Sequence, residues 1–301
     1  MANSLLAQPE KGYFNDLKAA MADPTAVEYL NLSSSGLTEC PVAIEQMTAL
    51  KKLDLGDNEI TELPEFLGTL NQLKYLRLDN NPIQQFPQSM TRLSNLEILS
   101  ARGIRIGSLP SNLRDWSNLR ELDLQGCQLT SVPEELGQIS SLLWLDISFN
   151  QISDLPASLG NLRKLHTLKI ASNRLKSLPV EMAQLAQLQT LQLGANRFDQ
   201  IPQIVYQLKN LRQLGIEFNR IRSISKQISY LRELEVLNVG SNLLEDMPVD
   251  RLQKLTKLKL LMVSGNPFSR PYKEKLRRNF QGRLILQAVE KRVTEWRSRR
   301  E

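Results

Sequence analysis

Apolar residues recur along this chain with a fixed period of 23 residues. The pattern is LxxLxLxxNxLxxLPxxLxxLxx, and places in it are numbered from its first residue. Eleven copies begin at Val27, Leu50, Leu73, Leu96, Leu119, Leu142, Leu165, Leu188, Leu211, Leu234 and Leu258. Nine of the ten steps between them are 23 residues long, and the last is 24. Such a period predicts a solenoid, because one repeat cannot bury its own apolar face and must stack on its neighbours.

The opening LxxLxL predicts a short strand, because its apolar residues alternate with the others. In the sixth copy we expect Leu145 and Ile147 to be buried, while Trp144, Asp146 and Phe149 face out. The Pro at place 15 has no backbone N–H to donate, which favours an irregular convex side. The segments that follow it are too short for stable isolated helices, so we expect single helical or 3₁₀ turns there.

Place 9 holds Asn in most copies, and we expect a buried ladder of amides that bond to the backbone of adjacent repeats. The fourth and fifth copies depart from this rule with Ile104 and Cys127, and the fourth also has Ala101 at an apolar place. Two interpretations stay open for this stretch. It is either drift that strong neighbours tolerate or a local bend.

These residues resemble the leucine-rich repeat family, over about four fifths of the chain. The LPxxLxxL spacing is similar to that of cytoplasmic members: Ras-pathway scaffolds, Ras-group-related plant proteins and bacterial counterparts. The resemblance implies an α/β solenoid, a horseshoe with a parallel β-sheet on its concave face. It also implies protein binding without naming a partner, because fold does not fix function.

The two ends are expected to cap the stack, because an uncovered terminal repeat exposes core and a sheet edge. Residues 1–26 form the predicted N-terminal cap, with an amphipathic helix over Glu10–Ala22 whose Phe14, Leu17 and Met21 share one face. The eleven repeats occupy residues 27–269.

Residues 270–301 form the predicted C-terminal cap. We expect a helix over Pro271–Phe280, a short strand at Leu284 and Leu286, and a second amphipathic helix. The second helix would carry Val289, Val293 and Trp296 on one face.

All of the net charge of +6 comes from this last segment, whose 11 Lys and Arg against 4 Asp and Glu give +7 while the rest of the chain carries −1. The simpler interpretation is a cap helix with a solvated basic face. The alternative is that the basic C-terminal helix binds nucleic acid or an anionic membrane.

The chain has two cysteines, Cys40 and Cys127, which fall at core places several repeats apart and are not expected to pair. The absence of disulfide-bonded caps favours a reducing compartment. The sequence shows neither a signal-peptide pattern at its start nor an uncharged stretch of membrane-spanning length. We therefore expect a cytoplasmic protein, with an injected bacterial effector as the alternative.

Catalysis is not expected. The one histidine, His166, has no thiol or Ser-His-Asp partners, the chain has no GxxxxGK[ST] loop, and neither a cofactor nor a metal is predicted. Asp123 and Asp146 share a place in adjacent repeats, but a concave sheet offers no closed pocket for acid–base work.

A partner surface is expected on the concave face, where places 2, 3, 5, 7 and 8 should be exposed. Aromatic residues beside charges have the composition of a binding hot spot. The predicted site consists of Tyr75, Arg77, Asp123, Trp144, Asp146, Phe149, Lys169 and Phe218. Trp144 and Phe149 are its anchors. The sequence thus predicts a monomeric, non-catalytic scaffold or adaptor that grips a protein partner.

Overall fold

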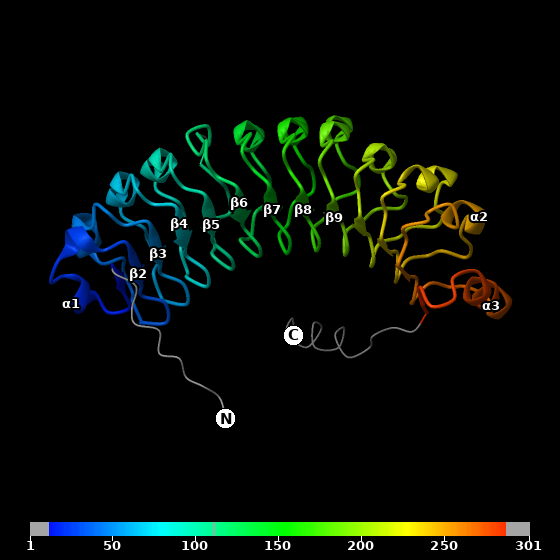
Figure 1. The fold of residues 1–301 in the computed structure, drawn as a ribbon, viewed down its shortest axis with the longest axis horizontal. Coiled ribbons are helices and arrows are strands. Elements are labelled where there is room, and N and C mark those ends of the chain that lie inside the picture. Colours follow the sequence, from blue (N-terminus) through cyan, green and yellow to red (C-terminus); the bar gives the residue numbers. More distant parts are fainter. Residues whose placement is uncertain (1–11, 111, 287–301) are drawn as a thin grey trace, which may run out of the picture.

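The structure, a computed structural model, describes residues 12–110 and 112–286, and these residues form a curved solenoid (Figure 1). Its strands make one 13-stranded parallel sheet in chain order. They are β1 Tyr13–Phe14, β2 Tyr29–Asn31, β3 Lys52–Asp54, β4 Tyr75–Arg77, β5 Ile98–Ser100, β6 Glu121–Asp123, β7 Trp144–Asp146, β8 Thr167–Lys169, β9 Thr190–Gln192, β10 Gln213–Gly215, β11 Val236–Asn238, β12 Leu260–Met262 and β13 Leu284–Ile285. The predicted α/β solenoid is confirmed.

Register follows the sequence period. Leu122, Leu145 and Leu168 pair directly across β6, β7 and β8, and all three are fully buried. The same row of central residues continues through every repeat, so the core is one continuous column of aliphatic side chains. Burial of this apolar area is the main stabilising term of a stack that has few local contacts within a repeat.

Short helices line the convex side, as Figure 1 shows. The 3₁₀ helices are η1 Pro24–Ala26, η2 Val42–Gln46, η3 Glu65–Thr69, η4 Gln88–Arg92, η5 Glu134–Gln138, η6 Ala157–Asn161, η7 Val180–Gln184, η8 Gln203–Gln207 and η9 Lys226–Tyr230, and α2 Val249–Leu252 is a short α-helix. Pro residues directly precede seven of the 3₁₀ helices. The missing N–H of Pro costs nothing at a helix start, which is why the predicted convex turns form there.

Glycine at place 19 lets neighbouring convex turns approach closely. A Cβ on Gly160 in η6 would lie 2.3 Å from the backbone oxygen of Glu181 in η7. Gly68 and Gly137 stand at the same place with equally close backbone neighbours.

The fourth repeat is the irregular one, and residues 112–117 hold no helix. Trp116 fills a core place that holds Leu in most other repeats; it is fully buried and its indole N–H donates to the Met90 carbonyl at 2.9 Å. A large side chain therefore stands in the core of the repeat in which Ala101 is small.

The predicted Asn ladder is confirmed. The Asn173 amide nitrogen donates to the carbonyls of Ile147, Ile170 and Ala171 at 2.9, 3.2 and 3.3 Å. Its oxygen accepts the Ile152 N–H at 3.0 Å. Asn58, Asn81, Asn150, Asn196, Asn219 and Asn242 make the same set of bonds to backbone carbonyls.

The two positions of this ladder that lack Asn, Ile104 and Cys127, differ in their hydrogen bonding. The Cys127 thiol keeps one bond by donating to the Ala101 carbonyl at 2.9 Å, whereas Ile104 is simply buried. Burial raises the pKa of both Cys40 and Cys127 to about 12, and both thiols are free, as predicted.

The N-terminal cap differs from the predicted helix over Glu10–Ala22. Gly12 has a left-handed φ of +88°, which ends any helix there, and β1 pairs with β2 instead. The Asp16 side chain accepts the N–H groups of Lys18 and Ala19, so helix α1 covers only Leu17–Ala20. The cap still packs Phe14, Leu17 and Met21 against the core, as the sequence indicates.

At the C-terminal end, helix α3 (Arg270–Asn279) and β13 form as expected. Leu276 and Phe280 are buried, and the Tyr272 hydroxyl donates to the Met247 carbonyl at 2.8 Å. The predicted second helix with Val289, Val293 and Trp296 lies outside the described residues. Within the described part of the chain, no helix combines the length and apolarity needed to cross a bilayer.

Candidate protein-binding site

The N-terminal part of the concave face holds one guanidinium surrounded by carboxylates. Arg77 on β4 lies 3.2 Å from Asp54, 2.7 Å from Asp57 and 2.9 Å from Asp79. Hydrogen bonds from Asn80 and Arg77 lower the pKa of Asp57. Three carboxylates thus fix the Arg77 side chain, and little of its conformational entropy remains to be lost on binding.

Tyr75 lies beside this cluster on the same strand. It is half-buried, and its burial raises its pKa. Tyr75 therefore stays neutral at physiological pH and presents an aromatic ring with a polar tip to the concave side.

Asp123 and Asp146 pair in register on β6 and β7, so the predicted proximity is confirmed. Their predicted exposure is wrong, because the two residues are only 4% and 3% exposed. Arg102 bonds to Asp123 through its guanidinium, and the Lys169 Nζ lies 3.6 Å from an Asp146 oxygen. Long cationic side chains thus cover the two carboxylates, and burial raises the pKa of Asp123 against the effect of Arg102.

Trp144 lies at the centre of the sheet, on β7. The Lys169 Nζ lies 4.8 Å from the centre of its ring, a cation–π contact, and the same ammonium faces Asp146. Trp144 is half-buried. Lys169, which Asp146 holds through an ion pair, therefore packs against the predicted anchor.

Phe149 and Phe218 lie away from the strands on which the other predicted residues sit. Each comes three residues after the end of its strand, at place 8, with φ of +58° and +54°. They are 42% and 47% exposed. The prediction that both are exposed is confirmed, but the structure places them at the loop edge of the sheet and not beside Trp144.

Place 8 adopts a left-handed conformation in all eleven repeats. Its φ lies between +51° and +73° at Ser34, Asp57, Asn80, Gly103, Gly126, Phe149, Ser172, Ala195, Phe218, Ser241 and Gly265. The frequent Ser, Gly, Asn and Asp in this column were the available indication in the sequence. Phe at such φ is uncommon and strained, so these two side chains are held outward by the repeat itself.

Glu217 is a concave residue that the predicted site omits. Its carboxylate lies over Gly194 and Gly215, where added Cβ atoms would approach it to 2.7 and 3.1 Å. One oxygen is buried with no hydrogen-bond partner among the described residues, and desolvation raises the pKa of the carboxyl. Gly194 at the same place in the preceding repeat, and Gly215 two residues before Glu217, were the sequence feature that could have revealed it.

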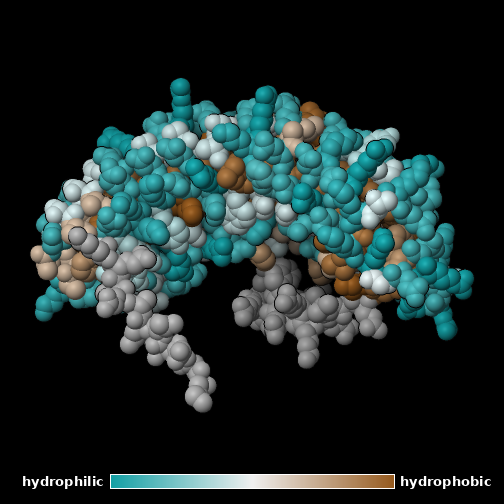
Figure 2. All heavy atoms as spheres, in the orientation of Figure 1, coloured by the Kyte–Doolittle hydropathy of each residue, from teal (hydrophilic) through white to brown (hydrophobic). Residues whose placement is uncertain are grey.

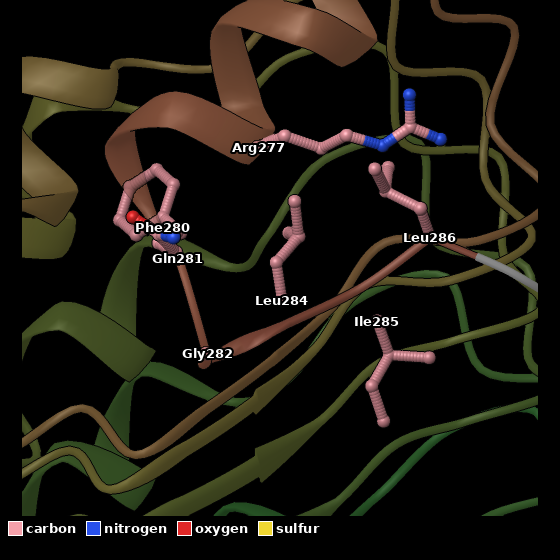
Figure 3. Close-up of a pocket in the computed structure, with 7 residues that line it drawn as sticks. All are labelled: Arg277, Phe280, Gln281, Gly282, Leu284, Ile285 and Leu286. Atoms are coloured by element: carbon pink, nitrogen blue, oxygen red, sulfur yellow. The ribbon is translucent and has the colours of Figure 1, made fainter.

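A hollow of about 420 Å³ opens at the C-terminal end of the stack (Figure 3). It lies between α3 and β13, and Leu284 and Leu286 point into it while Ile285 points to the other side of the strand. Among residues 12–110 and 112–286, no group of three or more His, Cys, Asp or Glu side chains is placed to hold a metal ion.

Figure 2 shows one flat side of the horseshoe, where hydrophilic side chains cover most of the surface and hydrophobic residues form smaller patches.

Solved structures share this fold over most of the chain. A leucine-rich repeat protein from Leptospira interrogans is 24% identical, with a TM-score of 0.52, and the match covers 91% of this chain and 99% of that one. An internalin from Listeria monocytogenes is 22% identical, with a TM-score of 0.69, and the match covers 88% and 82% of the two chains.

A third structure is the ectodomain of the plant membrane receptor kinase GASSHO1/SCHENGEN3 from Arabidopsis thaliana, in complex with CASPARIAN STRIP INTEGRITY FACTOR 2. It is 26% identical, with a TM-score of 0.68, and the match covers 85% of this chain and 32% of that one. The search of curated proteins gave no match.

Models of two kinds of repeat region match the sequence itself. "Leucine rich repeat" matches residues 25–83, 49–106 and 117–175, and "Leucine-rich repeat region" matches residues 159–291. Neither describes a catalytic domain, and together they span all eleven repeats except a short stretch of the fourth. This chain therefore belongs to the leucine-rich repeat family.

Proposed function

We propose that the protein is a non-catalytic scaffold or adaptor whose concave face binds a protein partner. The observation that carries this proposal is the fixed geometry around Trp144, where Lys169 stacks on the ring and pairs with Asp146. A partly exposed aromatic side chain held by its neighbours loses little freedom on binding, as the anchors of protein interfaces do.

The dimensions of the face support a macromolecular partner. Thirteen strands at a spacing of ~4.8 Å give a sheet roughly 60 Å long, which exceeds any metabolite. The Arg77 cluster and Tyr75 would form the polar rim of such an interface. The plant ectodomain above was solved in complex with another protein, which supports the same use of the fold.

We further propose a reducing compartment, the cytoplasm. Cys40 and Cys127 are both free and buried, and among the described residues no disulfide ties either cap to the repeats. The LPxxLxxL spacing of the repeats, which is similar to that of cytoplasmic scaffolds, also supports this proposal.

The test is a photo-crosslinking experiment with a crosslinker at position 121, because the exposed Glu121 pairs in register with Trp144 and its replacement leaves that anchor in place. A matched protein carries the crosslinker at Val42 on the convex side, which is 68% exposed. We expect a discrete adduct from position 121 and none from position 42. The Trp144→Ala variant, checked for folding by circular dichroism, should fail to capture the same protein in a pull-down.

A deletion of residues 288–301 separates the alternative function from this one. If the basic C-terminal segment carries binding, the deletion should abolish capture and Trp144→Ala should leave it intact. A binding reaction that also weakens steeply with salt would then indicate a nucleic acid or an anionic membrane.

A further inference from the structure

Three arginines stand in a row at the loop edge of the sheet, in the seventh, eighth and ninth repeats. Arg174, Arg197 and Arg220 all occupy place 10, and their N–H groups donate at 2.8 Å to Ile152, Leu175 and Phe198 of the preceding repeat. Equivalent backbone bonds put the three residues in register. All three are exposed, and none takes part in an ion pair within the described ranges. We name this row the arginine edge.

Charges are arranged differently at place 2, where each strand begins. There, cations have an acidic neighbour in an adjacent repeat and form ion pairs with it, with Lys51 at 2.6 Å from Glu28 and Lys74 at 3.0 Å from Glu97. Like charges on adjacent strands disfavour the folded state. The arginine edge therefore costs free energy that an anionic partner would offset.

Apolar side chains accompany the arginine edge. Phe149, Phe218 and Leu243 are between 41% and 47% exposed, at places 8 and 10 of the sixth, ninth and tenth repeats. The small residues Ser172 and Ala195 lie between the two Phe positions. They leave an open hollow of about 480 Å³, lined also by Phe149, Arg174 and Arg197.

We propose that the arginine edge, with Phe149 and Phe218 at its two ends, binds an acidic protein segment that carries apolar side chains among its carboxylates. Guanidinium groups bind carboxylates through paired hydrogen bonds, and the aromatic rings would receive the apolar residues. This surface is separate from the concave site around Trp144, so either site can fail without the other.

Two other occupants fit less well. The chain's own C-terminal segment is basic, with 11 Lys and Arg against 4 Asp and Glu over residues 270–301, and the arginines would repel it. Single-stranded nucleic acid stacks successive bases on closely spaced aromatic residues. Phe149 and Phe218 are instead three repeats apart, and Ser172 and Ala195, which occupy the same place between them, offer no ring for a base to stack on.

The test uses fluorescence anisotropy with three labelled probes: a peptide of repeated Glu-Glu-Phe units, the same peptide with Gln for Glu, and single-stranded oligothymidine of similar length. The acidic peptide should bind at least about tenfold more tightly than the Gln peptide. Its affinity should fall between about 50 and about 200 mM salt, because exposed charges are screened.

The variant Arg174→Gln/Arg197→Gln/Arg220→Gln should weaken binding of the acidic peptide by about 10- to 100-fold. The matched control Lys164→Gln/Arg232→Gln/Lys254→Gln removes the same charge from exposed residues outside the edge and should change it less than about threefold. Phe149→Ser/Phe218→Ser should weaken it by about tenfold. This last variant should fold, because Ser34, Ser172 and Ser241 already adopt the required φ.

Equal losses in the arginine variant and its control would overturn the proposal, since the attraction would then be one of net charge alone. Binding of the acidic peptide by the arginine variant at wild-type affinity would overturn it too. Tighter binding of oligothymidine than of the acidic peptide, lost in the arginine variant, would reassign the edge to nucleic acid.

Discussion

At the scale of single residues, the Asn ladder joins each repeat to the one before it. The Asn173 side chain forms hydrogen bonds with three carbonyls and one N–H, and Asn173 is only 8% exposed. Asn173→Ala should lower the free energy of unfolding by about 1–3 kcal/mol, because it leaves buried backbone groups unpaired.

Ser172→Ala is the matched control for this change. Ala195 already occupies the same place with φ +53°, so the substitution introduces no new strain. Urea denaturation should give a lower midpoint for Asn173→Ala alone, and equal midpoints for the two variants would contradict the ladder's role.

Glu217 should make stability depend on pH. Desolvation raises its pKa in the folded protein above the ordinary value of 4.5, so the folded state holds this proton more tightly than the unfolded state. The favourable contribution is complete below pH 4.5 and is lost as pH rises through the folded pKa. Glu217→Gln should therefore raise the urea midpoint at pH 7.

That gain should shrink as the pH is lowered and should be lost below pH 4.5, where the wild-type carboxyl becomes protonated in both states. Urea titrations of both proteins at several pH values measure this difference in midpoint. A gain that is the same at all pH values would point to packing on Gly194 and Gly215 and not to the buried charge.

Residue-level details were the least predictable part of the site. The period placed Trp144, Asp146 and Lys169 on the concave side, but alternation alone could not show that Lys169 and Arg102 fold down over the two carboxylates. The conformations of long side chains depend on neighbours 21 and 23 residues away, and a repeat pattern does not encode them. The left-handed φ of Phe149 could not be predicted from this residue alone, because the repeat imposes that conformation on whichever residue occupies place 8.

At the scale of elements, Gly160 lets η6 and η7 pack with almost no space between them. Ala is usually the better helix residue, but here its methyl group would meet the Glu181 backbone. Gly160→Ala should therefore destabilise the protein by about 1–3 kcal/mol, the usual cost of overpacking.

Ala183 occupies the same place in the next repeat and gives the control. Ala183→Gly should cost at most about 1 kcal/mol, the propensity difference. Thermal denaturation of both variants tests the pair, and a more stable Gly160→Ala protein would show that the convex turns can separate freely.

The sequence predicted the repeated elements better than the terminal ones. Eleven strands and the Pro-initiated turns follow from a pattern that every repeat enforces on its neighbours. Tyr13 and Phe14 lie outside that pattern, and only their pairing with Tyr29 and Leu30 turns a helix-like sequence into a strand. Contacts between the cap and the first repeat override local propensity there.

At the scale of the whole molecule, the solenoid must protect the edge of its last strand. Leu276 of α3 and Phe280, which directly follows this helix, are buried, and β13 pairs with β12. A chain ending at Gly265 would expose β12 and the core above it. We expect this truncated protein to self-associate, because open sheet edges pair with other chains.

Size-exclusion chromatography with light scattering measures the outcome. A chain ending at Leu286, which keeps α3 and β13, is the control and should stay monomeric. Monomeric behaviour of the shorter protein would mean that β12 needs no cover.

The left-handed place 8 has a further consequence for how such a surface can change. Its backbone conformation is the same for Gly, Ser, Asp, Asn, Ala and Phe, so the fold does not dictate which side chain is displayed. The side chain at place 8 of each repeat can therefore be replaced without a change in the backbone of the solenoid. A library of variants that differ only at these eleven positions would alter the ligands that this edge recognises and keep the same fold.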